Sequence, residues 1–202
     1  MVDTGELGEI TVIRCYGIDP SSQLESFVRF SKNNNSGGIF ADMAIHDIDL
    51  IRWFTNQEVD NVWALGKNAA YPELDEVNEI ETGSAMMELA NGSMALLVTG
   101  RNAAHGYHVE TEIIGTKGML RVGASPDKNL VTVFNEAGAI RPCSQDFPER
   151  FGPAFVNEMT AFALCVLEDL DSPITAIDGL KATEIANACQ KSFTEKKLIS
   201  VN

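Results

Sequence analysis

Residues 81–103 read ETGSAMMELANGSMALLVTGRNA, two apolar runs joined by Asn91-Gly92. This dipeptide supplies the positive φ angles of a type I′ turn, which joins adjacent antiparallel strands. Successive strand residues point to opposite faces of a sheet. The first run therefore places Ala85, Met87 and Leu89 on one face and Met86, Glu88 and Ala90 on the other. The stretch predicts a β-hairpin in an antiparallel sheet, with neither face wholly polar.

Further strands are predicted on both sides of this hairpin, where β-branched and aromatic residues alternate between turn signals. The connections between the predicted strands that follow the hairpin, up to residue 135, are too short for crossover helices. Consecutive strands should therefore pair antiparallel. A polar loop is expected after the first strand, and an acidic loop over residues 71–80. The predicted strands cover residues 8–19, 59–69, 107–114, 118–122, 130–135 and 198–201.

Three helices are predicted from apolar runs and from helical spacing. Residues 39–54, IFADMAIHDIDLIRWF, lack Gly and Pro and predict one buried helix. A second helix is predicted because apolar residues recur with a spacing near 3.6 residues, and a third helix is predicted after Ser172-Pro173. The apolar faces comprise Phe155, Met159, Phe162, Ala163, Val166 and Leu170 in the second helix, and Ala182, Ile185, Ala186, Cys189 and Phe193 in the third.

Composition and element order predict one α+β domain over residues 1–202, an open, mainly antiparallel sheet with helices on one face. The 202 residues carry a formal charge of −14, which disfavours binding to nucleic acid or to an anionic membrane. No apolar run approaches the ~18 residues that span a bilayer, and no signal peptide is evident. We therefore expect a soluble, cytoplasmic protein.

Three ionisable residues form a stripe on the otherwise apolar helix of residues 39–54. At about 100° per residue, Asp42, His46 and Asp49 fall within an arc of roughly 60°. Since lone buried charges are costly, the stripe should face a partner, and a cleft is one such partner. At positions i and i+4, Asp42 could orient the imidazole of His46 for proton transfer near neutral pH. A structural ion pair or hydrogen bond is the more common role of such a pair.

Two further histidines, His105 and His108, flank Gly106-Tyr107 where two predicted strands meet. His105 and Tyr107 could bind substrate hydroxyl groups there, or be exposed loop residues. A metal site built from Asp42, His46 and one of these histidines is conceivable. Because no second histidine on the helix completes a recognised ligand motif, we expect no metal.

Several segments resemble one family of oxidoreductases. The run GGIFADMAIHDIDLIRW (37–53) closely resembles the Gly-Gly-x-x-x-Asp-x-x-x-His-x-x-Asp segment of the Gfo/Idh/MocA oxidoreductases, particularly inositol 2-dehydrogenases. The segments GELGEITVIR (5–14), GTKGML (115–120) and DGLKATEIANACQKSF (178–193) also resemble that family's pattern, in the right order. The resemblance covers essentially the whole chain.

This resemblance implies a C-terminal domain with helices on one sheet face and subunit contacts, in a homodimer or homotetramer, on the other. It implies that Asp42 and His46 are the catalytic pair, with His46 taking the hydroxyl proton of a polyol or sugar while hydride leaves for a nicotinamide. Asp49 matches a position that holds substrate hydroxyls. The implied function is oxidation of a secondary alcohol, with inositol as the expected substrate.

The sequence departs from the family's pattern in what should precede this domain. We find no Gly-x-Gly-x-x-Gly after a strand and no acidic ribose ligand, so a Rossmann domain is not expected in these residues. The family's Glu-Lys-Pro motif, which supplies a catalytic lysine, is absent too. NAD or NADP would be bound mainly outside this chain, and the isolated chain should be inactive. A non-catalytic sugar-binding or assembly module of the same fold is the alternative. Some inositol dehydrogenases have an aromatic residue where His105 stands, so substrate identity follows less directly than reaction class.

Overall fold

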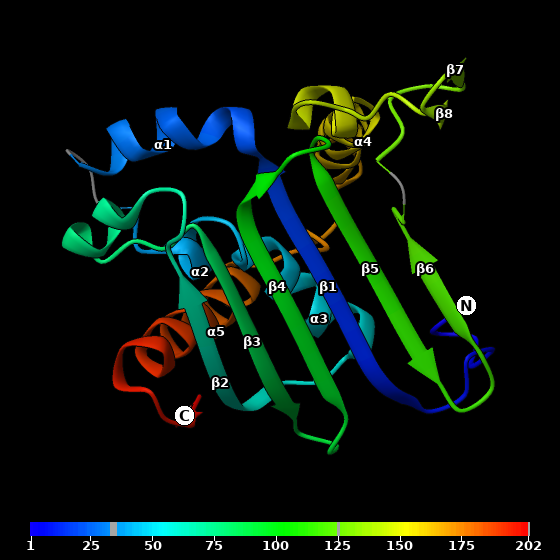
Figure 1. Cartoon of the computed structure of the whole chain (residues 1–202). Helices are drawn as coiled ribbons and strands as arrows, with labels where there is room; N and C mark the ends of the chain where they lie inside the picture. Colours follow the sequence, from blue (N-terminus) through cyan, green and yellow to red (C-terminus); the bar gives the residue numbers. More distant parts are fainter. Residues whose placement is uncertain (33–35, 125, 202) are drawn as a thin grey trace.

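The computed structural model describes residues 1–32, 36–124 and 126–201. Seven strands form one sheet in the order β6-β5-β1-β4-β3-β2-β9, with helices against it (Figure 1). All strand pairs in this sheet are antiparallel except β1 with β4, which confirms the predicted fold class. The strands are β1 Ile10–Pro20, β2 Val59–Lys67, β3 Thr82–Leu89, β4 Met94–Ala103, β5 His108–Gly115, β6 Met119–Val122 and β9 Ile199–Ser200.

The hairpin of β3 and β4 is confirmed, but its turn is not type I′. Gly92 has a φ of +81°, whereas Asn91 is not among the described residues with positive φ. The Gly92 amide donates to the Leu89 carbonyl at 2.7 Å, which closes a turn before the left-handed glycine. The Asn91 side chain accepts from the amide and hydroxyl of Ser93. The connection is thus a longer one, in which only the glycine needs the left-handed conformation.

Strand β1 lies between β4 and β5, parallel to β4 and antiparallel to β5. Consecutive strands β4 and β5 therefore do not pair with each other, contrary to the prediction. Residues 130–135 also do not extend the sheet. Only β7 (Val133–Asn135) forms there, and it pairs with β8 (Gly138–Ile140) in a separate two-stranded sheet. Turn signals alone could not show that a distant strand occupies the intervening position.

Helices α2 (Ile39–Asp42), α3 (Ile45–Thr55) and α5 (Ala176–Glu195) cover one face of the sheet (Figure 1). The core lies between these helices and the inward side chains of the strands, which include Ile13, Leu97 and Ile113. The predicted face of the third helix is largely confirmed, since Ala182, Ile185, Ala186 and Cys189 are buried and Phe193 is partly buried.

The single helix predicted over residues 39–54 is two helices. Met43 has a φ of −114°, and the amides of both Met43 and Ala44 donate to the Ile39 carbonyl, so the regular hydrogen-bond ladder stops there. Helix α3 then starts afresh at Ile45. The break changes the helical phase, so an arc calculated for one continuous helix does not hold across it.

Two predicted loops contain short helices. The polar loop after β1 holds η1 (Ser21–Gln23) and α1 (Leu24–Ser31), and the acidic loop holds η2 (Pro72–Val77). Leu24, Val28 and Leu74 form a small second apolar cluster that joins α1 to η2.

Helix α4 (Phe147–Glu168) confirms the second predicted helix but not the burial of its apolar face. All its residues are described, and none is buried. Phe162 is 64% exposed, and the other large residues of the face are exposed as well. No helix in the described part of the chain is long and apolar enough to cross a membrane.

The outer face of the sheet carries an apolar stripe. Trp63 of β2, Met86 of β3 and Leu96 of β4 are paired across neighbouring strands. Trp63 and Met86 are exposed, whereas Ala85, Met87 and Leu89 on the inner face are buried. The predicted division of the hairpin into two faces is therefore confirmed.

Replacing Leu97 by Ala should destabilise the fold by about 2–5 kcal/mol, because this inward residue is 1% exposed and its loss leaves a cavity. Leu65→Ala is the matched control, since Leu65 is 47% exposed. Urea unfolding followed by circular dichroism measures both changes. Equal destabilisation by the two substitutions would contradict the assignment of the inner and outer faces.

Candidate active site

A cleft of about 880 Å³ lies where β1 and β5 meet the helices. Its floor includes Gly17 and Asp19 of β1 and Thr111 of β5, and its walls come from α2, α3 and α4. This volume is within the range of small-molecule sites, and the lining combines apolar side chains with a few ionisable groups. The cleft therefore suits a small polar ligand.

Asp42 and His46, the two residues predicted to act as a pair, both line this cleft. Asp42 ends α2 and His46 is in the first turn of α3, and both residues are exposed. The Asp42 carboxylate forms an ion pair with Arg101. Among the described contacts it makes no hydrogen bond to His46. The imidazole is thus open to a ligand while the carboxylate is held by a buried guanidinium.

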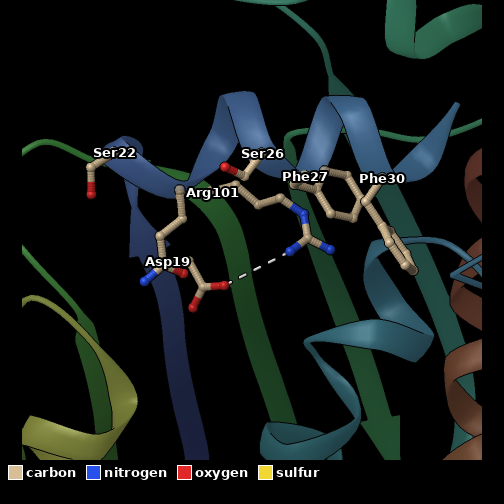
Figure 2. A pocket seen from close by; sticks show the side chains of 7 residues that line it. Asp19, Ser22, Ser26, Phe27, Phe30 and Arg101 are labelled. Atoms are coloured by element: carbon tan, nitrogen blue, oxygen red, sulfur yellow. Dashed lines mark ion pairs between the residues drawn. The ribbon is translucent and has the colours of Figure 1, made fainter.

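Arg101 of β4 links the two carboxylates at the end of the cleft next to α1. Its side chain lies beneath α1, with the guanidinium carbon 3.5 Å from the centre of the Phe27 ring, a cation–π contact. Figure 2 shows its second ion pair, with Asp19, at 3.8 Å. A shallow pocket of about 440 Å³ on the α1 side shares Asp19 and Arg101 with the cleft. Arg101 is therefore a buried cation between two carboxylates, Asp19 and Asp42.

Burial alters the titration of Asp19 and Tyr107. Desolvation raises the pKa of Asp19, although the charge of Arg101 and a hydrogen bond with Tyr107 oppose the rise. Desolvation and the charge of Asp19 raise the pKa of Tyr107 to about 12, so its hydroxyl stays protonated near neutral pH. The predicted site residue Tyr107 also lines the cleft, where its hydroxyl donates to Asp19 and its oxygen can accept a hydrogen bond.

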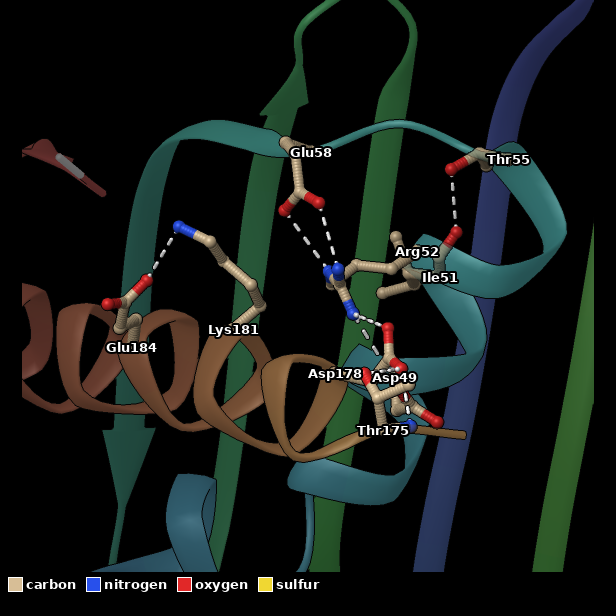
Figure 3. A network of polar contacts seen from close by, with 9 residues as sticks. All are labelled: Asp49, Ile51, Arg52, Thr55, Glu58, Thr175, Asp178, Lys181 and Glu184. Atoms are coloured by element: carbon tan, nitrogen blue, oxygen red, sulfur yellow. Dashed lines mark hydrogen bonds and ion pairs between the residues drawn. The ribbon is translucent and has the colours of Figure 1, made fainter. Parts of the chain in front are cut away.

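Asp49 lies outside the cleft, in a different network from Asp42 and His46. Its carboxylate is 3.8 Å from Arg52, which also contacts Glu58 and Asp178 (Figure 3). The network connects α3 to the first turn of α5. Asp49 is on the same helix as His46, so the break between α2 and α3 changes only the position of Asp42 relative to the other two residues. Contact between Asp49 and a substrate hydroxyl stays a prediction.

His105 is also not among the residues that line the cleft. Its Nε2 lies 2.9 Å from Nδ1 of His108, and His108 Nε2 lies 3.4 Å from Glu110. This arrangement is a surface hydrogen-bond chain beside Tyr107. No group of three or more His, Cys, Asp or Glu side chains suited to a metal ion occurs in the described part of the chain.

The charged cleft residues that the sequence analysis missed include Asp19, Asp47, Arg101 and Arg150. Two of them carried a signal. Arg101 is a charged residue within an otherwise apolar predicted strand, and Asp47 is an acidic residue beside His46 on a helix assigned as buried. Asp19 and Arg150 follow only from the arrangement of β1 and α4 in space.

Comparison with solved structures gives close matches. The scyllo-inositol dehydrogenase of Lactobacillus casei, solved with NAD(H) and scyllo-inositol bound, is 58% identical with a TM-score of 0.96. The match covers 99% of this chain and 59% of that one. The myo-inositol 2-dehydrogenase of Lactobacillus plantarum is 47% identical with a TM-score of 0.96, over 100% of this chain and 59% of that one.

A curated relative, the inositol 2-dehydrogenase of Rhizobium meliloti, is 28% identical over 99% of this chain and 59% of its own length. The chain thus spans less than two thirds of the proteins it matches. The family model of the GFO/IDH/MocA C-terminal domain matches residues 1–121. This match agrees with the sheet topology and with the Asp42–His46 segment. The chain therefore belongs to the Gfo/Idh/MocA family and corresponds to the C-terminal domain of that family.

Proposed function

We propose that residues 1–202 form one substrate-side domain of an NAD-dependent dehydrogenase that oxidises a secondary alcohol of an inositol or a similar polyol. The observation that carries this proposal is the placement of His46 and Asp42 together in an open cleft, with Arg101 against the carboxylate. The L. casei and L. plantarum enzymes, which share 58% and 47% of their residues with this chain over the matched region, support inositol as the substrate class.

In this proposal His46 is the general base that takes the proton of the reacting hydroxyl. Its ring makes no hydrogen bond among the described contacts, so a ring nitrogen can accept a hydrogen bond from that hydroxyl. Asp42, held by Arg101, accepts a hydrogen bond from a substrate hydroxyl and fixes the ring beside His46. The Tyr107 hydroxyl donates its one proton to Asp19, and its oxygen can accept a hydrogen bond from a substrate hydroxyl.

The cleft also suits a nicotinamide next to the polyol. Its volume exceeds the need of a six-carbon ring, and Leu50, Phe54 and Phe155 provide an apolar wall for a flat heterocycle. A bound nicotinamide would supply the hydride acceptor for the alcohol carbon. The relative solved with NAD(H) supports NAD as the cofactor, and contacts with the rest of the dinucleotide would come mainly from outside this chain.

Asp49 and His105, which do not line the cleft, would contact the substrate at its outer hydroxyl groups in this proposal. A cytoplasmic location and assembly into a homodimer or homotetramer are further parts. The apolar stripe on the outer sheet face supports assembly, because contiguous exposed apolar surface commonly marks an interface.

Replacing His46 by Ala should lower turnover of the dehydrogenase that carries this domain by ~10²–10⁴, the usual contribution of a general base. Since His46 is exposed, the melting temperature should not fall. Steady-state rates with scyllo-inositol and thermal melts of the same samples measure both. A well-folded variant with near-normal turnover would refute the assignment. If the domain is instead a non-catalytic sugar-binding module, the unsubstituted protein should bind polyol but show no turnover.

The 202-residue chain alone should show no measurable NAD affinity and no dehydrogenase activity, because its main sheet lacks the parallel βαβ arrangement that binds dinucleotides. Calorimetric titration with NAD and an absorbance assay for NADH formation test this. Micromolar binding of NAD would overturn the expectation.

The substitution Met86→Lys should weaken self-association, because it places a charge in the centre of the apolar stripe on the outer face. Sedimentation velocity at tens of micromolar protein should show assembly of the parent chain and a shift toward monomer in the variant. Thr183→Lys, on an exposed position of α5, is the control and should assemble normally. A parent chain that is wholly monomeric would contradict the proposed assembly.

A further inference from the structure

Asp47 is a buried carboxylate that the proposed reaction does not use. It is 4% exposed, and it lies in the first turn of α3, next to His46 in the sequence. Among the described contacts, none is a hydrogen bond or ion pair to its side chain. A buried ionisable group without a partner is costly, because water no longer solvates it. Such a group calls for a physical explanation.

The other buried acidic side chains of this protein all have partners. Glu81, 2% exposed, accepts hydrogen bonds from the amides of Ala69, Ala70 and Tyr71. Glu110 and Glu112 pair with arginines on the outer sheet face, and Glu79 accepts from the hydroxyl of Ser36. Each of these four carboxylates has at least one partner, although the Oε2 atom of Glu79 has none. Asp47 is the exception among the described residues.

The position of Asp47 relates it to the cleft. A Cβ atom on Gly17 of β1 would lie 2.5 Å from the Asp47 Oδ2 atom. The missing side chain at residue 17 is therefore what makes room for the carboxylate at the sheet. Both residues line the cleft, together with Thr111 and Tyr107. The carboxylate thus lies at the floor of the cleft, between β1 and α3.

We infer that Asp47 is a substrate-binding residue, which accepts a hydrogen bond from the polyol hydroxyl that enters deepest between β1 and α3. The inference rests on the proposed function and adds to it a determinant of specificity. A polyol that presents a hydroxyl at this position supplies the missing donor, whereas a deoxy analogue leaves the carboxylate without one. Sites built to hydrogen-bond a substrate hydroxyl reject analogues that lack it for this reason.

The titration of Asp47 supports this role. Burial raises its pKa to about 7, and no nearby cation opposes the rise. The neighbouring Cys15 thiol and Tyr107 hydroxyl both have pKa values raised to about 12, so neither carries charge near neutral pH. The other ionisable groups that line the cleft are Asp19, Asp42, His46, Arg101, Arg150 and Glu158. A hydroxyl that donates to the ionised carboxylate favours that form, so ligand binding should release a proton near pH 7.

The test compares Asp47→Asn with the parent protein, using scyllo-inositol and a monodeoxy-inositol as probes. Loss of a hydrogen bond to a charged acceptor should weaken scyllo-inositol binding by roughly tenfold to a hundredfold. The variant should bind the two probes with similar affinity, whereas the parent should prefer scyllo-inositol. Calorimetry at pH 7 in buffers of different ionisation enthalpy should show proton release by the parent and much less by the variant. Asp60→Asn, at an exposed position on β2, is the matched control.

Thermal melts without ligand separate this role from a structural one. A carboxylate that only stabilises the start of α3 would lower the melting temperature when replaced. A carboxylate kept for a ligand should leave it unchanged or raised, because the substitution removes an uncompensated buried charge. Equal polyol affinity and proton release in parent and Asp47→Asn would overturn the inference alone. A parent protein that binds neither probe would overturn the proposed function, and the inference with it.

Discussion

The placement of β1 between β4 and β5 is the constraint on which the cleft depends. The strand is parallel to one neighbour and antiparallel to the other, so its register fixes which residues end beside α2 and α3. Gly17 is paired with Thr99 of β4 and Val109 of β5, and Asp19 follows at the end of the strand. One strand from the start of the chain thereby connects the hairpin to the second half of the sheet.

Charge in the cleft is balanced unevenly. Arg101 forms ion pairs with both Asp19 and Asp42 and is covered by the Phe27 ring. Its charge therefore compensates two carboxylates at one end of the cleft. Asp47, deeper on the floor, receives no such compensation. One end of the cleft thus has preformed ion pairs, whereas the carboxylate of Asp47 has a place for a hydrogen-bond donor from a ligand. Such uneven satisfaction of polar groups is common where binding and stability compete.

Local sequence signals predicted which helices and strands form better than they predicted which strands pair with one another. The alternation in residues 82–89 and 94–103 identified the hairpin because both strands and their turn are adjacent in the chain. The position of β1 depends on pairing with residues about eighty positions away, which no local pattern encodes. The split at Met43 was missed because no Gly or Pro marks it. In the site, Asp42, His46 and Tyr107 line the cleft, whereas Asp49, on the same helix as His46, lies beside Arg52 instead.

Helix α4 has an energetic consequence for the cleft. Ordering a residue of backbone costs about 1–2 kcal/mol, which buried apolar contacts normally offset. None of the residues of α4 is buried, yet Phe147, Arg150 and Phe155 of this helix form one wall of the cleft. Amide hydrogens of α4 should therefore exchange at free energies below that of global unfolding. Any surface that packs on the exposed side of the helix would slow this exchange and, by linkage, strengthen ligand binding against the same wall.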